Sequence, residues 1–272
     1  MTNPLVSVVL PCFNVERYVK DAMTSLLTQS YRHLEIIAID DCSVDNTLNI
    51  LQEFAHQDER IRVFHNDKNL NLSATLNRGI GEAKGDYIVR MDADDISLPD
   101  RIEKQVSYME EHRDVGISGG SMEIVNESLV PIGFRSYFTD NKSIRQHIFM
   151  FSPFSHPAVI IRKSVLDKSG LYNKAFYPAE DYELYFRLGE NAKFANLKDT
   201  LIKYRVVGNS MTTGNTKNME LMTIKIRKKY YVSYKATVFD KLYNELHRLS
   251  IFIIPPRFKI RLFILLRNFI AR

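Results

Sequence analysis

The amino-acid sequence predicts an α/β fold: a mostly parallel sheet with helices on both faces, followed by a basic α-helical appendage at the C-terminus. Short apolar runs typical of buried strands alternate three times with stretches of helical spacing before residue 92, which is the βαβ pattern of a parallel sheet. A chain of 272 residues that is 45% hydrophobic suits one globular domain with an appendage. Residues 217–272 contain 13 Lys and Arg against three Asp and Glu, a charge of +10, so the preceding residues carry −5 of the net +5.

The first part of the chain is expected to contain four buried strands and three connecting helices. Each strand is a short, mostly aliphatic run, and Pro11 is expected to stop the first of them. Each helix has apolar residues spaced three and four apart on one face. The strands are expected at residues 5–10, 35–39, 61–64 and 87–91, and the helices at residues 15–27, 48–54 and 72–83.

The second part of the chain continues with elements of both kinds. Residues 126–155 show only a weak pattern. Helices are expected at residues 100–111, 141–150 and 180–188, and strands at residues 116–125 and 158–161. We therefore expect residues 1–216 to form the main domain and residues 217–272 to form a basic helical region.

Three acidic residues follow the fourth expected strand. Asp92, Asp94 and Asp95 lie within four positions of one another, and carboxylates this close repel unless a cation lies between them. Asp92 and Asp94 are two residues apart, so an extended backbone points both side chains to the same side. The cluster is at the usual ligand-binding edge of an open α/β sheet. Taken alone, it could equally be a solvated acidic turn.

Several other features of the sequence limit the classes of protein to which the chain could belong. The chain starts without a basic leader and apolar stretch, so we expect no signal peptide, and it has no run of 18 apolar residues that could span a bilayer. Cys12 and Cys42 do not have the spacing of a metal site, so we expect reduced thiols in a cytoplasmic protein.

Six short motifs occur in order between about residues 5 and 210. They are SVVLPCFN at 7–14, IDDCSVDNT at 39–47, NRGI at 77–80, DADD at 92–95, HPAVIIR at 156–162 and AEDYELYFRL at 179–188. Together they resemble the inverting glycosyltransferases of family 2, of the kind that build bacterial O-antigen, capsule and lipopolysaccharide. The resemblance implies a GT-A fold, a nucleotide-sugar donor and a divalent metal. It also implies a nucleotide-binding half at about 1–100 and an acceptor half at about 101–216.

By this resemblance, five residues contact the donor. Pro11, Phe13 and Asn14 lie along the nucleoside, with Phe13 against the uracil ring, although Pro11 could be only the strand stop. Asp40 accepts a hydrogen bond from uracil N3–H, which favours UDP over CMP donors. Arg78 resembles a helix position beside the donor, although a surface arginine is the alternative.

The resemblance also assigns the metal and diphosphate contacts. Asp94 is the direct ligand of Mn²⁺ or Mg²⁺, and Asp92 faces the ribose or reaches the metal through water. Arg205 is expected to bind the diphosphate from a late loop. Many relatives carry a histidine where this chain has Val207, so the third contact to the metal or diphosphate is open.

Asp181 is the expected catalytic base. Direct displacement at the anomeric carbon needs a carboxylate that removes the proton of the acceptor hydroxyl, and Asp181 matches the family motif. The alternative is that Glu180 and Asp181 only favour a helix N-terminus. Glu180 and His156 are expected on the acceptor side, although His156 could equally be a histidine satisfied in the core.

The basic C-terminal region is expected to bind a membrane surface. Apolar residues share one arc of a helix at 257–272, with arginines opposite, which suits an interfacial helix on anionic lipid. The alternative is packing on the catalytic domain or on a second copy of the chain, as in a homodimer. The basic stretch 225–231 has no nucleic-acid recognition motif beside it, so no nucleic-acid partner is expected.

The sequence thus predicts a hexosyltransferase that moves a galactose or glucose type of hexose from a UDP-sugar to a saccharide acceptor. A polyprenyl-diphosphate-linked acceptor would place the enzyme in the cytoplasm, peripherally attached to the inner face of the cell membrane. Two alternatives are a metal-dependent phosphoryl-transfer hydrolase and a non-catalytic sugar-nucleotide-binding or scaffold protein.

Overall fold

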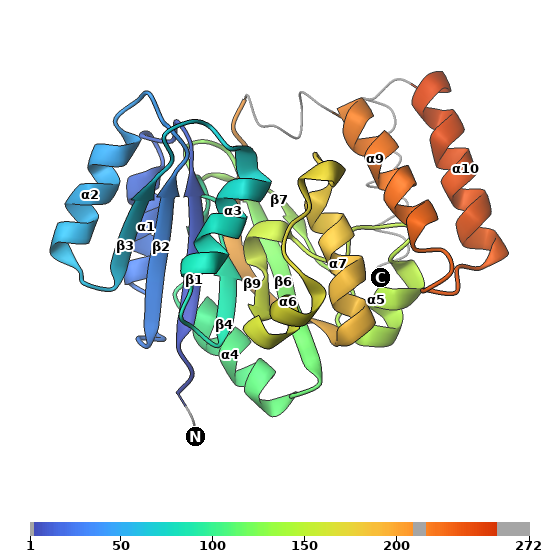
Figure 1. Ribbon diagram of the computed structural model, residues 1–272, viewed down its shortest axis with the longest axis horizontal. Coiled ribbons are helices and arrows are strands. Elements are labelled where there is room, and N and C mark those ends of the chain that lie inside the picture. Colours follow the sequence, from blue (N-terminus) through green and yellow to red (C-terminus); the bar gives the residue numbers. More distant parts are fainter. Residues whose placement is uncertain (1–2, 209–215, 255–272) are drawn as a thin grey trace.

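The protein is organised around one mixed sheet with helices on both of its faces (Figure 1). The computed structural model describes residues 3–208 and 216–254. Across these residues the strand order is β3-β2-β1-β4-β8-β6-β9-β5, with β7 paired to β6. Strands β1 to β4 are parallel to one another, whereas β8 runs antiparallel to both β4 and β6. The α/β fold is confirmed, and the sheet is parallel in its first half and mixed as a whole.

The expected strands are present, and further strands join them. The strands are β1 (Val6–Cys12), β2 (Leu34–Asp40), β3 (Ile61–His65), β4 (Tyr87–Arg90), β5 (Ile96–Ser97), β6 (Val115–Val125), β7 (Pro131–Arg135), β8 (Ile160–Arg162) and β9 (Lys193–Arg205). Pro11 does not stop the first strand, because it lies inside β1 opposite Ile39, and Cys12 lies opposite Asp40. A proline is tolerated there because β4 pairs with β1 only from Val6 to Val9, so at Pro11 the strand pairs with β2 alone.

The helices also match the expected ones, with one addition. They are α1 (Val19–Leu27), α2 (Thr47–Gln57), α3 (Asn71–Glu82), α4 (Arg101–Glu111), α5 (Asn141–His147), α6 (Lys163–Ser169), α7 (Glu180–Asn191), α9 (Thr216–Lys229) and α10 (Val238–Ile253), with 3₁₀ turns η1 (His156–Ala158) and η2 (Lys174–Phe176). The expected helix at 257–272 lies outside the described residues. No helix in the described part of the chain is long and apolar enough to cross a membrane.

The apolar strands are buried on both faces of the sheet. Val8 and Leu10 of β1 pack into a core with α1, α2 and α4, whereas Val9 between them packs into a second core with α3, α7 and α9. Successive side chains of a strand point to opposite faces, so continuous apolar runs are what a doubly covered sheet requires. Helices α9 and α10 stand side by side at the end of the molecule away from α2, and α10 is the outermost (Figure 1).

Candidate active site

The carboxyl ends of β1, β2 and β4 meet at one edge of the sheet. Parallel register places Cys12 beside Asp40 and Val9 beside Arg90, so the loops that follow these strands are neighbours. The buried Cys12 thiol lies close to the carboxylates of these loops. Burial and then the charges of Asp40 and Asp94 raise its pKa well above the usual value. The acidic segment after β4 therefore lies where the strand order of an α/β sheet places a ligand.

Three carboxylates form the predicted acidic cluster. One oxygen each of Asp92, Asp94 and Asp95 lies within 4.8 Å of the others. Burial and then the charge of Asp92 raise the pKa of Asp94 to about 6, and burial with both neighbours raises the pKa of Asp95 well above its usual range. Oδ2 of Asp95 is buried without a hydrogen-bond partner among the described residues. A site that gathers negative charge and leaves a buried oxygen unsatisfied fits Mg²⁺ or Mn²⁺, which prefer oxygen ligands.

Arg90 is a site residue that was not predicted. It ends β4, and only 5% of its side chain is exposed. Its Nη2 and Nη1 atoms contact Oδ1 and Oδ2 of Asp92 at 2.5 and 2.7 Å. The signal in the sequence was a charged residue that continues an apolar strand, since a buried charge requires a partner. Arg90 fixes the Asp92 carboxylate and supplies a counter-charge to the cluster.

Arg205 holds the acidic turn from its protein side. Its backbone N–H donates to Asp95 Oδ1 at 2.8 Å, and its Nε donates to the carbonyl oxygen of Asp94 at 2.8 Å. Its Nη atoms donate to the Glu127 carbonyl oxygen and to Asp21 Oδ2, each at 3.0 Å. Every guanidinium nitrogen is engaged, so in this structure Arg205 positions the carboxylates. These bonds use three of the five guanidinium N–H groups, and the contact of Arg205 with a diphosphate stays a prediction.

Replacing Arg205 by methionine is therefore expected to destabilise the fold. Three charge-assisted hydrogen bonds are lost from a buried guanidinium, so the free energy of unfolding should fall by about 3 kcal/mol in urea denaturation. Arg17 provides a matched control, because it pairs with Glu127 in the same region but its side chain is 69% exposed. R17A should change stability by less than about 0.5 kcal/mol. Equal effects of the two variants would remove Arg205 from this role.

Helix α7 brings a second pair of carboxylates to the same region. Burial raises the pKa of Asp181, and the charges of Arg90 and Asp92 also act on it, so Asp181 lies within electrostatic reach of the acidic cluster. Oδ1 of Asp181 accepts a hydrogen bond from the N–H of Tyr182 at 2.7 Å. Glu180 is 4% exposed, burial raises its pKa, and its Oε2 has no partner among the described residues. A carboxylate with a raised pKa is a better proton acceptor near neutral pH.

His156 adjoins these groups but makes a hydrogen bond of its own. Its Nε2 lies 2.8 Å from the Tyr172 hydroxyl, and the two rings tilt against each other at 5.5 Å. Burial and then the charge of Arg90 lower the pKa of His156 well below its usual value, so the ring is neutral at neutral pH. A neutral imidazole paired with a hydroxyl is typical of a histidine satisfied in the core, and its acceptor-side role stays a prediction.

The loop after β1 forms the predicted nucleoside side of the site. Phe13 is 47% exposed. Asn14 adopts a left-handed conformation with φ of 52°, its N–H donates to Ser43 Oγ at 3.0 Å, and its Oδ1 accepts from the Val44 N–H at 2.9 Å. Asn14 thus ties the loops after β1 and β2 together and leaves the Phe13 ring open to a ligand.

Asp40 and Arg78 are less accessible than expected. The Asp40 side chain is not exposed, and its Oδ2 lies 2.8 Å from His65 Nδ1 and accepts from the Ser43 N–H at 3.2 Å. Its Oδ1 is buried without a partner among the described residues. Arg78 donates to the His65 carbonyl oxygen at 2.6 Å and to Asn66 Oδ1. Both residues therefore brace the ends of β2 and β3, and their donor contacts stay predictions.

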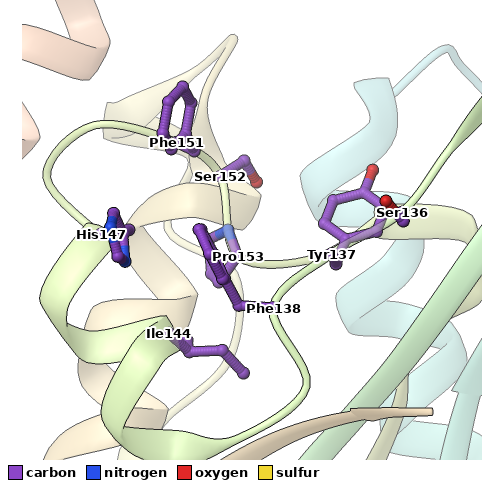
Figure 2. Close-up of a pocket in the computed structure, with 8 residues that line it drawn as sticks. All are labelled: Ser136, Tyr137, Phe138, Ile144, His147, Phe151, Ser152 and Pro153. Atoms are coloured by element: carbon purple, nitrogen blue, oxygen red, sulfur yellow. The ribbon is translucent and has the colours of Figure 1, made fainter. Parts of the chain in front are cut away.

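A small pocket lies beside α5 (Figure 2). It is lined mostly by aromatic and other apolar side chains: Ser136, Tyr137, Phe138, Ile144, His147, Phe151, Ser152 and Pro153. Its volume of about 20 Å³ leaves room for about one water molecule and none for a sugar ring. The donor therefore cannot occupy this pocket in the conformation described.

Comparison with known proteins decides the family. The sequence profile of glycosyl transferase family 2 matches residues 7–170, from β1 to the end of α6. The chain belongs to glycosyl transferase family 2. An uncharacterised glycosyltransferase of Haemophilus influenzae is 33% identical over 92% of this chain and 80% of its own length. The O-antigen biosynthesis glycosyltransferase WbnJ of Escherichia coli is 32% identical over 74% of this chain and 80% of its own length.

Solved structures share the fold of this glycosyltransferase. S. aureus TarS, solved with UDP-GlcNAc, superposes with a TM-score of 0.66 at 19% identity, covering 83% of this chain and 66% of that one. The mannosyltransferase PcManGT of Pyrobaculum calidifontis, solved with GDP-Man and Mn²⁺, gives a TM-score of 0.70 at 14% identity, covering 92% and 74%. At these identities the likeness is one of fold, and it confirms the predicted GT-A architecture.

Proposed function

We propose that this glycosyltransferase moves a hexose from a UDP-sugar to a saccharide acceptor by direct displacement with inversion. The observation that carries the proposal is the placement of two carboxylate groups within electrostatic reach of each other. The acidic cluster follows β4, Asp181 lies in the first turn of α7, and the charge of Arg90 acts on both. The acidic cluster suits a divalent ion that would bind the diphosphate leaving group. The carboxylate of Asp181 suits removal of the proton from the attacking hydroxyl.

Different residues of the site act on the donor and on the acceptor in this proposal. Asp94 and Asp92 would hold Mn²⁺ or Mg²⁺, and Arg90 orients Asp92 for that task. When bound, the ion supplies positive charge that offsets the charge of the departing diphosphate. The exposed Phe13 ring offers a stacking surface to the base. Asp181 takes the proton of the acceptor hydroxyl as that oxygen attacks the anomeric carbon.

The acceptor in this proposal is a growing saccharide on a polyprenyl diphosphate at the inner face of the cell membrane. Relatives named for O-antigen and amylovoran biosynthesis support a role in surface polysaccharide synthesis. Family membership favours a transferase over a phosphoryl-transfer hydrolase. The resemblance to family 2 is the basis for proposing galactose or glucose as the transferred sugar, and a screen of donors tests this choice.

A donor screen with Mn²⁺ tests the proposal. UDP-glucose, UDP-galactose, UDP-GlcNAc and GDP-mannose are each incubated with the enzyme, and the release of nucleoside diphosphate is measured with and without saccharide acceptors. We expect release from a UDP-hexose that an acceptor accelerates. Release from GDP-mannose alone would overturn the choice of nucleotide, and release that no acceptor changes would favour a hydrolase.

Metal affinity should depend on pH through Asp94. Because the pKa of Asp94 is raised to about 6, a proton competes with the cation below this pH. Affinity for Mn²⁺ should fall by at least about tenfold per unit below pH 6, as measured by calorimetry. D94N should bind Mn²⁺ more weakly and lose the inflection near pH 6. A wild-type affinity that stays constant through pH 6 would contradict the assignment of Asp94 as a ligand.

A further inference from the structure

Helix α10 is amphipathic, and its polar side, rather than its apolar side, packs against the rest of the protein. Asp240 closes a capping box with Thr237, and its side chain is buried. Asn244 donates to the Ile224 carbonyl oxygen of α9 at 3.4 Å. His247 Nδ1 lies 3.0 Å from Arg227 Nη1 of α9. Asn244 and His247 join α10 to α9, and the buried Asp240 lies on the same side of the helix, so this side of α10 faces inward.

The apolar side of α10 therefore faces outward. Its residues expose 48 to 84% of their surfaces, and they are Val238, Phe239, Leu242, Leu246, Leu249, Phe252 and Ile253. They begin and end with an adjacent pair and otherwise follow one another at spacings of three and four, so they form a continuous stripe along the helix, here called the α10 stripe. A stripe of this extent is typical of a surface that another phase or molecule covers.

We propose that the α10 stripe docks this enzyme on an anionic lipid bilayer. This inference goes beyond the proposed function and does not depend on the transfer chemistry. An interfacial helix inserts its apolar face among the acyl chains and keeps basic residues at the headgroups. The stripe meets both requirements, because the exposed Lys241 and Arg248 lie along one of its edges.

The positive charge around the stripe favours an anionic lipid surface over the other molecules that could cover it. Residues 217–254 contain eight Lys and Arg, of which Arg227 is buried, against three Asp and Glu. Of the acidic residues, Asp240 is buried, and Glu245 is already paired with Lys228 at 2.6 Å and with Arg248 at 2.7 Å. Residues 255–272 add five Lys and Arg and no acidic residue. A second copy, or this C-terminal segment, would bring like charges together, whereas anionic headgroups complement them.

The hairpin of α9 and α10 also links the stripe to the catalytic end of α7. Lys229 Nζ, at the end of α9, and the hydroxyl of the next residue, Tyr230, bind Glu183 Oε1 at 2.7 and 2.8 Å, two residues along α7 from Asp181. A cavity of about 390 Å³ lies between the loop that precedes Asp181 and α9, and it is lined by Tyr177, Pro178, Asn218, Leu221, Met222 and Lys225. Docking through α10 would therefore be linked, through α9, to the helix that carries Asp181.

A single tryptophan reporter tests the inference, because the chain contains no tryptophan. L246W places the probe in the α10 stripe, and F134W is the matched control on β7, since Leu246 and Phe134 are 57% and 60% exposed. Full-length protein is mixed with vesicles of phosphatidylcholine alone or with added phosphatidylglycerol. We expect L246W emission to shift to the blue and to be quenched by brominated lipid only when the anionic lipid is present, and F134W to stay unchanged.

A matched pair of triple variants measures the contribution of the stripe. L242Q/L246Q/L249Q should lower sedimentation with anionic vesicles by about tenfold or more, because three half-exposed leucines no longer insert. V130Q/I132Q/F134Q, which removes exposed apolar residues of β7 and its preceding turn, should leave sedimentation unchanged. Unchanged melting temperatures would confirm that both variants fold. Equal sedimentation of the wild type and the α10 variant would overturn the proposal.

Two further outcomes would assign the stripe to another occupant. Without lipid, acrylamide should quench L246W fully at every protein concentration. Shielding that grows with concentration would show that a second copy covers the stripe, and shielding at all concentrations would show that the chain itself covers it. Either result would overturn the lipid assignment.

Discussion

D94N is expected to lower turnover of the nucleotide-sugar donor by about a thousandfold, because the leaving diphosphate loses its main counter-charge. The substitution keeps the shape of the side chain and removes one of three carboxylates that lie within 4.8 Å of one another. Donor binding in the presence of Mn²⁺ should weaken in parallel. Nucleoside diphosphate release under saturating Mn²⁺ measures the first effect.

D100N is the matched control for this variant. Asp100 lies six residues further along the chain, where it pairs with Lys104 at 2.8 Å and its side chain is 48% exposed. It should retain turnover within about twofold, because an exposed helical ion pair contributes little. If D94N kept the activity of D100N, the acidic cluster would not be the metal site.

D181N is expected to lower the rate of transfer by about a hundredfold to ten-thousandfold while the donor KM changes little. The amide cannot take the proton of the acceptor hydroxyl, yet it still accepts the N–H of Tyr182 as the carboxylate does. Since burial raises the pKa of Asp181, wild-type activity should fall on the acid side at a pH above the usual range of an aspartate. Single-turnover measurements at saturating donor separate this effect from binding.

Glu190 provides the control on the same helix. It is exposed near the far end of α7, so E190Q should transfer at the wild-type rate. A D181N enzyme that still transferred the sugar at that rate would leave Glu180 as the carboxylate to test next, because its buried Oε2 has no partner among the described residues.

The strands that carry the site could be predicted because their apolar character is local. Runs such as the one at Leu34–Asp40 are buried on both faces, so composition alone marks them. Strand β9 was not predicted, since its residues Lys193–Arg205 mix polar and apolar types, and its structure depends on pairing with β6 and β5. Local pattern does not contain that information.

The acidic cluster was likewise predictable, whereas the role of Arg205 in orienting it was not. Asp92 and Asp94 are close in sequence, so their meeting needs no knowledge of the fold. Arg205 lies 110 positions from the Asp95 side chain that it anchors, and only the tertiary structure joins them. Which face of α10 packs against the protein could not be predicted either, because an amphipathic pattern does not say which face turns inward.

Calorimetric titration of UDP into the wild-type enzyme tests the central claim most directly, which is that the carboxylates after β4 hold a divalent ion that binds the nucleoside diphosphate. We expect binding in Mn²⁺ to be at least about tenfold tighter than in EDTA, and D94N to remove the difference. Equal affinity of the wild type in Mn²⁺ and in EDTA would contradict the account.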